Sequence, residues 1–156
     1  MAWLGRLFPC QIDNDFEGGR AALWLLGLLI ALKLVVSLNS ILNTASVAAG
    51  ADGIALGSFS PAAAREVLTL FAMAALGQLA LTLVALAALI RWRALVPFLF
   101  LVMLAEQLAR RLIVQTHDPM RTGSSVVGWY VVYGVLALLV FGLVLSLLPA
   151  RRGTGA

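Results

Sequence analysis

Long apolar runs, separated by short polar or glycine-rich pieces, account for most of this 156-residue chain. A helix needs about 20 mostly apolar residues to cross a bilayer, and four segments reach that length. They are Ala21–Leu42, Ala62–Ile90, Ala94–Thr116 and Val126–Leu148. The pattern predicts an all-α polytopic membrane protein, a bundle of four transmembrane helices with short loops.

The pieces between these spans are too short for a separate soluble domain. They are an N-terminal segment (1–20) that we expect at the membrane interface, loops 43–61 and 117–125, a turn at 91–93 and a tail at 149–156. Ser60 and Pro61 predict the start of the second span, as a cap followed by proline at the first helical position. Gly142 and Ser146, four residues apart, predict a close contact between the fourth span and a neighbouring helix.

Arginines at the ends of the apolar runs predict the orientation of the chain. Arg91 and Arg93 occupy a turn so short that it forces an antiparallel hairpin, and positive charge favours the cytoplasmic side. Arg151 and Arg152 follow the fourth span and indicate the same side. We therefore expect a multi-pass protein with both termini in the cytoplasm and loops 43–61 and 117–125 outside. Heavy use of Ala, Leu and Arg is typical of GC-rich bacterial genomes and favours a bacterial inner membrane.

The net charge of +4 comes from arginines scattered over helix ends rather than gathered on one face. A basic patch of the kind that binds nucleic acid is therefore not predicted. We expect membrane lipids as partners, together with a membrane-protein complex or further copies of the chain.

The third span carries three charged residues, Glu106, Arg110 and Arg111, which oppose insertion. Both arginines lie near its outer end, where long side chains reach the headgroups. We expect them to contact lipid phosphates or another anion. A re-entrant segment, the alternative, would move the C-terminus outside and contradict the final arginine pair.

Polar residues on different spans fall at one depth. Lys33, Gln78 and Glu106 each lie twelve residues from the cytoplasmic end of their span, roughly 18 Å deep. We expect Lys33 and Glu106 to pair, with Arg110 as a rival partner four residues along the same helix. The predicted polar cluster consists of Lys33, Gln78, Glu106, Gln107, Arg110 and Tyr133.

Motifs for catalysis are missing from the sequence. The single cysteine, Cys10, excludes an intramolecular disulfide, and the single histidine, His117, excludes bis-histidine haem ligation within one chain. Neither a metal site nor a cofactor is predicted.

Three functions fit these residues. The first is a non-catalytic accessory, assembly or structural component of a membrane complex. The second is a small proton-coupled transporter that uses Lys33 and Glu106. The third is a membrane enzyme or a quinone- or anion-binding subunit, because Lys33, Arg110 and Arg111 outnumber the one carboxylate of Glu106.

Overall fold

A computed structural model of the chain describes residues 2–9, 11, 13–16, 18–117 and 126–148. Within this part the structure is helical and has no strands. In chain order the elements are α1 (Ala2–Leu7), α2 (Arg20–Leu42), α3 (Thr44–Gly50), η1 (Leu56–Ser58), α4 (Pro61–Arg91), η2 (Arg93–Leu95), α5 (Val96–His117) and α6 (Val126–Leu147). The predicted all-α class is therefore confirmed.

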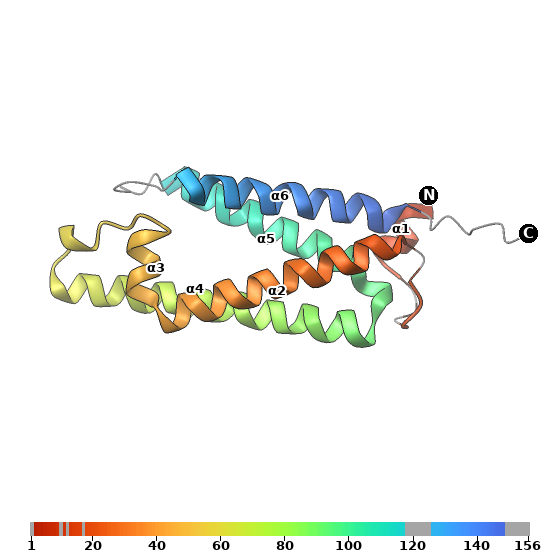
Figure 1. The fold of residues 1–156 in the computed structure, drawn as a ribbon, viewed down its shortest axis with the longest axis horizontal. Helices are drawn as coiled ribbons and strands as arrows, with labels where there is room; N and C mark the ends of the chain where they lie inside the picture. Colours follow the sequence, from red (N-terminus) through yellow and green to blue (C-terminus); the bar gives the residue numbers. More distant parts are fainter. Residues whose placement is uncertain (1, 10, 12, 17, 118–125, 149–156) are drawn as a thin grey trace, which may run out of the picture.

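The four long helices lie lengthwise beside one another (Figure 1). α2 packs mainly on α4 and α5 mainly on α6, and a further contact between α2 and α6 joins the two pairs. We call the end where α2 and α5 begin the proximal end, and the end where they finish the distal end. α1 lies at the proximal end, beside the last turn of α6 (Figure 1).

Among the residues that the structure describes, three helices are long and apolar enough to cross a membrane: α2, α4 and the stretch of α6 from Tyr130 to Leu147. They are compatible with a multi-pass membrane protein. The fourth long helix, α5, has 22 residues and would span about 33 Å, but Glu106 lies at its middle and Arg110 and Arg111 lie in its distal half. Because of these charges, α5 does not qualify as a membrane span by length and composition, whereas the other three helices do.

The start of α4 follows the predicted capping pattern. The Ser60 hydroxyl oxygen accepts a hydrogen bond from the Ala63 N–H at 3.3 Å, and Pro61 is the first helical residue. α4 ends at Arg91, and the chain reaches α5 through Trp92 and η2, so α5 begins at Val96 rather than Ala94.

The predicted loop 43–61 contains two helical elements, α3 and η1. α3 has the sequence TASVAAG, in which three of seven residues are alanine, the strongest helix former. The sequence predicted a plain loop here, but its alanines favour a helical turn. α3 packs on α2 and α4 and thereby closes the distal side of this helix pair.

The hydrophobic core lies in the proximal half of the bundle. Its buried members come from all four long helices: Ala22, Leu26, Leu29, Ile30, Ala85, Ala88, Val96, Leu99, Phe100, Met103 and Leu139. The predicted close contact at Gly142 is present, since a Cβ atom built there would lie 2.2 Å from a ring carbon of Phe100. Glycine is therefore what allows α6 to approach the α5 ring this closely.

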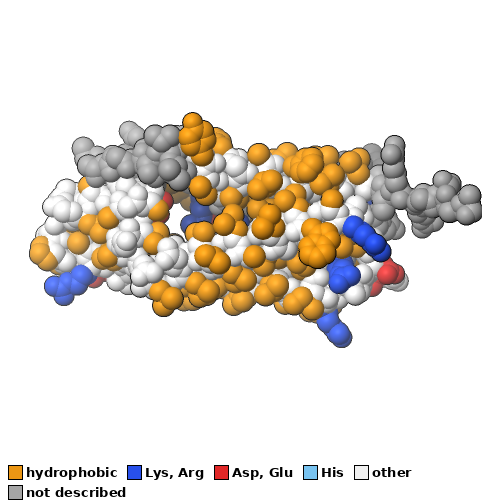
Figure 2. All heavy atoms as spheres, in the orientation of Figure 1, with side chains coloured by type: hydrophobic (Ala, Val, Ile, Leu, Met, Phe, Trp, Pro, Cys, Tyr) orange, Lys and Arg blue, Asp and Glu red, His pale blue; other side chains and the backbone are white. Residues whose placement is uncertain are grey.

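Apolar side chains also cover the outside of the molecule. In Figure 2 they occupy the middle of the visible face, and most charged side chains lie toward the two ends. Leu28, Leu76, Leu112 and Phe141, one from each long helix, are all more than half exposed. Water-soluble proteins rarely expose so continuous an apolar surface, so this exterior is compatible with a lipid environment.

Candidate functional site

The buried face of α2 changes character along its length. Toward the proximal end it presents apolar residues to the core, and from Lys33 onward its buried residues are polar. Lys33, Ser37 and Ser40 are each less than 9% exposed. They follow one another at helical spacing, so a single face of α2 carries both the apolar core and the polar region.

Glu106 of α5 lies opposite Lys33 and joins two cations. The Lys33 Nζ donates to Glu106 Oε2 at 3.0 Å, and the Arg110 Nε donates to the other carboxylate oxygen, Oε1. The sequence made Lys33 and Arg110 rival partners of Glu106, but the carboxylate accepts from both. The Lys33 side chain is 9% exposed, that of Glu106 20% and that of Arg110 49%, so the group extends from the interior to the surface.

The next residue of α5, Arg111, connects this helix to α6. Its Nη2 donates to the Tyr133 hydroxyl oxygen at 3.1 Å, and its guanidinium carbon lies 5.5 Å from the centre of the Tyr133 ring. A guanidinium within about 6 Å of an aromatic ring face gains a cation–π attraction. Side chains of α5 therefore reach α2 through Glu106 and α6 through Arg111.

Of the predicted polar cluster, Lys33, Glu106 and Arg110 are joined, Tyr133 contacts Arg111 instead, and the two glutamines lie apart from this group. Gln78 bonds within α4, where its Nε2 donates to the Thr82 hydroxyl at 3.5 Å. The Thr82 hydroxyl in turn donates to the Gln78 carbonyl at 2.7 Å. Gln107 has no hydrogen bond to any residue that the structure describes. Equal depth did not bring Gln78 to Glu106, because α4 packs mainly on α2 and contacts α5 little.

Ser37, one helical turn beyond Lys33, is the least exposed polar residue of this α2 face. Its hydroxyl is fully buried and has no hydrogen-bond partner among the described residues. An unsatisfied buried hydroxyl costs free energy. Nothing in the sequence indicates that the hydroxyl of Ser37 would lie without a partner.

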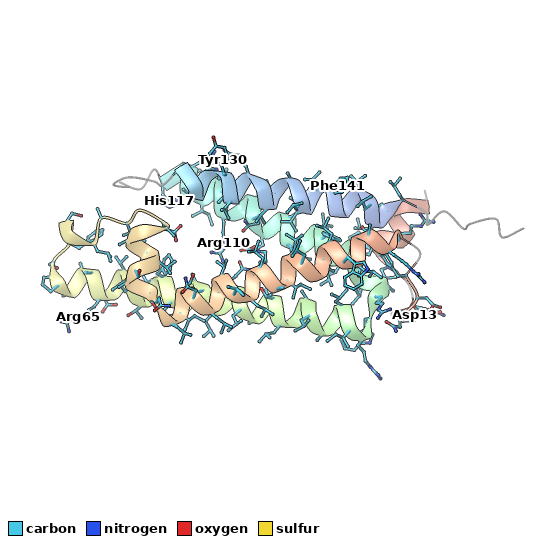
Figure 3. All side chains as sticks on the ribbon, viewed as in Figure 1. Asp13, Arg65, Arg110, His117, Tyr130 and Phe141 are labelled. Atoms are coloured by element: carbon cyan, nitrogen blue, oxygen red, sulfur yellow. The ribbon has the colours of Figure 1, made fainter. Side chains whose placement is uncertain are left out.

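An opening lies beside the ion-paired group on the face shown in Figure 2. The space-filling view is hollowed there, and Lys or Arg side chains line its wall. Figure 3 labels Arg110 in the same place, where it extends from α5 toward α2. Lys33, Arg110, Arg111 and Glu106 sum to a net charge of +2 in this region. Such a surface attracts anions, and its carboxylate could also exchange a proton.

A second feature, absent from the sequence-based prediction, lies at the proximal end. A cavity of about 440 Å³ is lined there by residues that include Arg6, Asp13, Gly18, Ala94 and Ser146. Arg6 Nη1 donates to the Leu147 carbonyl at 2.9 Å, which satisfies an acceptor at the end of α6. These contacts join segments more than 100 residues apart, so no local pattern could predict them.

Within the described residues, no group of three or more His, Cys, Asp or Glu side chains could hold a metal ion. Cys10, Arg151 and Arg152 lie outside the described residues. His117 is exposed at the end of α5, where its Nδ1 lies 3.0 Å from the Ile113 carbonyl oxygen.

Fold and site together define a helical protein whose long apolar helices are compatible with membrane insertion and whose α2 and α5 are joined by the ion-paired group of Lys33, Glu106 and Arg110. No known protein family matches the chain, and neither a curated protein nor a solved structure is significantly similar to it.

Proposed function

We propose that the chain crosses a bacterial inner membrane four times, with α2, α4, α5 and α6 as spans and both termini in the cytoplasm. Support for α5 as a span comes from its position beside α6 and from the way its charges are compensated. Glu106 is paired on both oxygens, and the two arginines lie in the distal half, within reach of the headgroups. The proximal end, which carries Arg91 and Arg93, is then cytoplasmic.

A topology experiment tests this arrangement. Alkaline phosphatase, which is active only outside the cytoplasm, is fused after residue 156 and, in a second fusion, within the segment 117–125. We expect activity from the second fusion alone. Activity from the C-terminal fusion would contradict four spans, because it would place the end of α6 on the outer side.

Within this topology we infer that the protein is a non-catalytic accessory or structural component of a membrane complex. The observation that carries this inference is the shared carboxylate of Glu106, which accepts from Lys33 and Arg110 together. A carboxylate engaged on both oxygens favours a fixed contact between α2 and α5 over a proton-exchanging site. The transporter hypothesis draws on the opening beside Arg110, the residue that binds Glu106 (Figures 2 and 3).

Two measurements separate these functions. Protein extracted in mild detergent from its own membranes should elute in a particle that contains other chains in fixed ratio. A particle made of this chain alone would contradict the accessory role. Purified protein in liposomes should show no proton-dependent flux of substrates. Flux that Glu106→Gln abolishes, and that the exposed control Glu66→Gln retains, would establish transport instead.

A further inference from the structure

The guanidinium of Arg110 is bonded on its Nε edge, and its other edge is exposed. Its Nε donates to Glu106, while its two terminal nitrogens, Nη1 and Nη2, have no partner among the described residues. Half of the side chain is exposed (49%). A guanidinium whose terminal nitrogens are unengaged can donate two parallel hydrogen bonds, the geometry that suits the oxygens of a phosphate.

The contacts of Glu106 determine the orientation of the Arg110 guanidinium. Lys33 holds one oxygen of the carboxylate at 3.0 Å, and the other oxygen receives the Arg110 Nε. The first bond holds the carboxylate in place, and the second holds the guanidinium against that carboxylate before any ligand arrives. Pre-organisation of this kind reduces the ordering cost of binding. The surplus of positive charge around Glu106 favours an anion over a neutral ligand.

The opening beside Arg110 lies on the long side of the bundle rather than at its end (Figures 2 and 3). On the visible face, apolar side chains cover the surface on its proximal side. Along α5, Arg110 is 14 residues from Val96, or roughly 21 Å at 1.5 Å per residue, in a hydrocarbon layer about 30 Å thick. A long arginine side chain can span most of the remaining distance to the distal headgroups.

We propose that this opening binds the phosphate group of a membrane lipid through Arg110, with the acyl chains along the apolar surface of the bundle. This proposal rests on the proposed membrane location, but on neither the accessory nor the transport role. Arg111 is the next residue of α5 and contacts Tyr133. Its guanidinium adds positive charge beside the proposed headgroup position. An anionic phospholipid fits the excess of positive charge better than a zwitterionic one.

Native mass spectrometry of the full chain, released from delipidated detergent micelles, tests the proposal. Three probes are titrated: phosphatidylglycerol, diacylglycerol with the same acyl chains, and inorganic phosphate. We expect a bound phosphatidylglycerol that survives release and no comparable adduct with diacylglycerol. Equal retention of diacylglycerol would overturn the proposal, because the phosphate would then contribute nothing. Competition by inorganic phosphate at similar concentration would indicate a site for a free anion instead.

Variants assign the site to Arg110. Arg110→Gln should weaken phosphatidylglycerol binding about tenfold or more, since a hydrogen bond to a charged group contributes this much. Arg110→Lys keeps the positive charge but lacks the planar guanidinium, so its affinity for phosphatidylglycerol should lie between that of the unchanged protein and that of Arg110→Gln. Arg65→Gln is the matched control, because Arg65 is an exposed arginine near the distal start of α4 and far from the opening (Figure 3). An equal loss in Arg65→Gln, or full binding by Arg110→Gln, would refute the assignment. A correctly folded Arg110→Lys keeps the test decisive if Arg110→Gln fails to fold.

Discussion

Replacing Glu106 with glutamine should destabilise the bundle more than replacing Lys33 with methionine. The carboxylate is shared, so its removal leaves Lys33 without a counter-charge at a position only 7% exposed. Removing one partner of a buried pair costs about 3–5 kcal/mol. After Lys33→Met, Glu106 still has Arg110, and we expect a loss of about 1.5–3 kcal/mol, the size of one hydrogen bond to a charged group.

The double variant gives the sharpest result. Lys33→Met with Glu106→Gln removes the stranded ammonium, and the remaining Arg110 is 49% exposed and needs no buried partner. We expect the double variant to be about 2 kcal/mol more stable than Glu106→Gln alone, because the second change relieves a buried unpaired charge. Equilibrium unfolding in mixed detergent and SDS micelles, followed by the helical circular dichroism signal, measures all three free energies.

Two results would refute this reasoning. Additive losses in the cycle would mean that Lys33 and Glu106 do not interact. A Glu106→Gln loss no larger than that of Glu66→Gln, an exposed glutamate of α4, would mean that Lys33 finds another counter-charge. We expect the Glu66 control to change stability by no more than about 0.5 kcal/mol, as surface substitutions usually do.

Two further predictions concern packing and burial, and the same unfolding assay checks both. Gly142→Ala should cost about 1–3 kcal/mol, because the new methyl group overlaps the Phe100 ring; the control Gly77→Ala, where a Cβ meets no atom within 4 Å, should stabilise α4 by about 0.5–1 kcal/mol. Equal effects at the two glycines would contradict the close contact. Ser37→Ala should stabilise the bundle by about 1 kcal/mol, because it removes a buried hydroxyl without a described partner; a clear loss of stability would show that this hydroxyl is satisfied.

The helical class and the approximate bounds of the long helices could be predicted from the sequence because both depend on local properties. Runs of apolar residues favour helices of bilayer length, and the Ser60 cap, the Pro61 start and the arginines of the 91–93 turn are signals within a few residues of the boundary they mark. The helix α3 was missed because it has only seven residues and its composition is a weak signal.

Side-chain partners within the site depended on which helices lie side by side. Equal depth correctly brought Lys33 to Glu106, but it could not exclude Gln78, which lies on α4 and bonds within its own helix. Only the tertiary arrangement, with α5 packed on α6 and separated from most of α4, decided between them. Depth is one coordinate along the membrane normal, and a contact also requires the rotation and the neighbours of each helix.

What the sequence by itself determined is therefore the set of long helices and the distribution of charge along each of them. These follow from hydropathy and helical periodicity, which act within one segment. The tertiary structure decided that Glu106 is shared by Lys33 and Arg110, that Arg111 reaches Tyr133, and that Gly142 admits the Phe100 ring. Each of these depends on how helices rotate and pack against one another, and many weak contacts distributed over the whole bundle determine that packing.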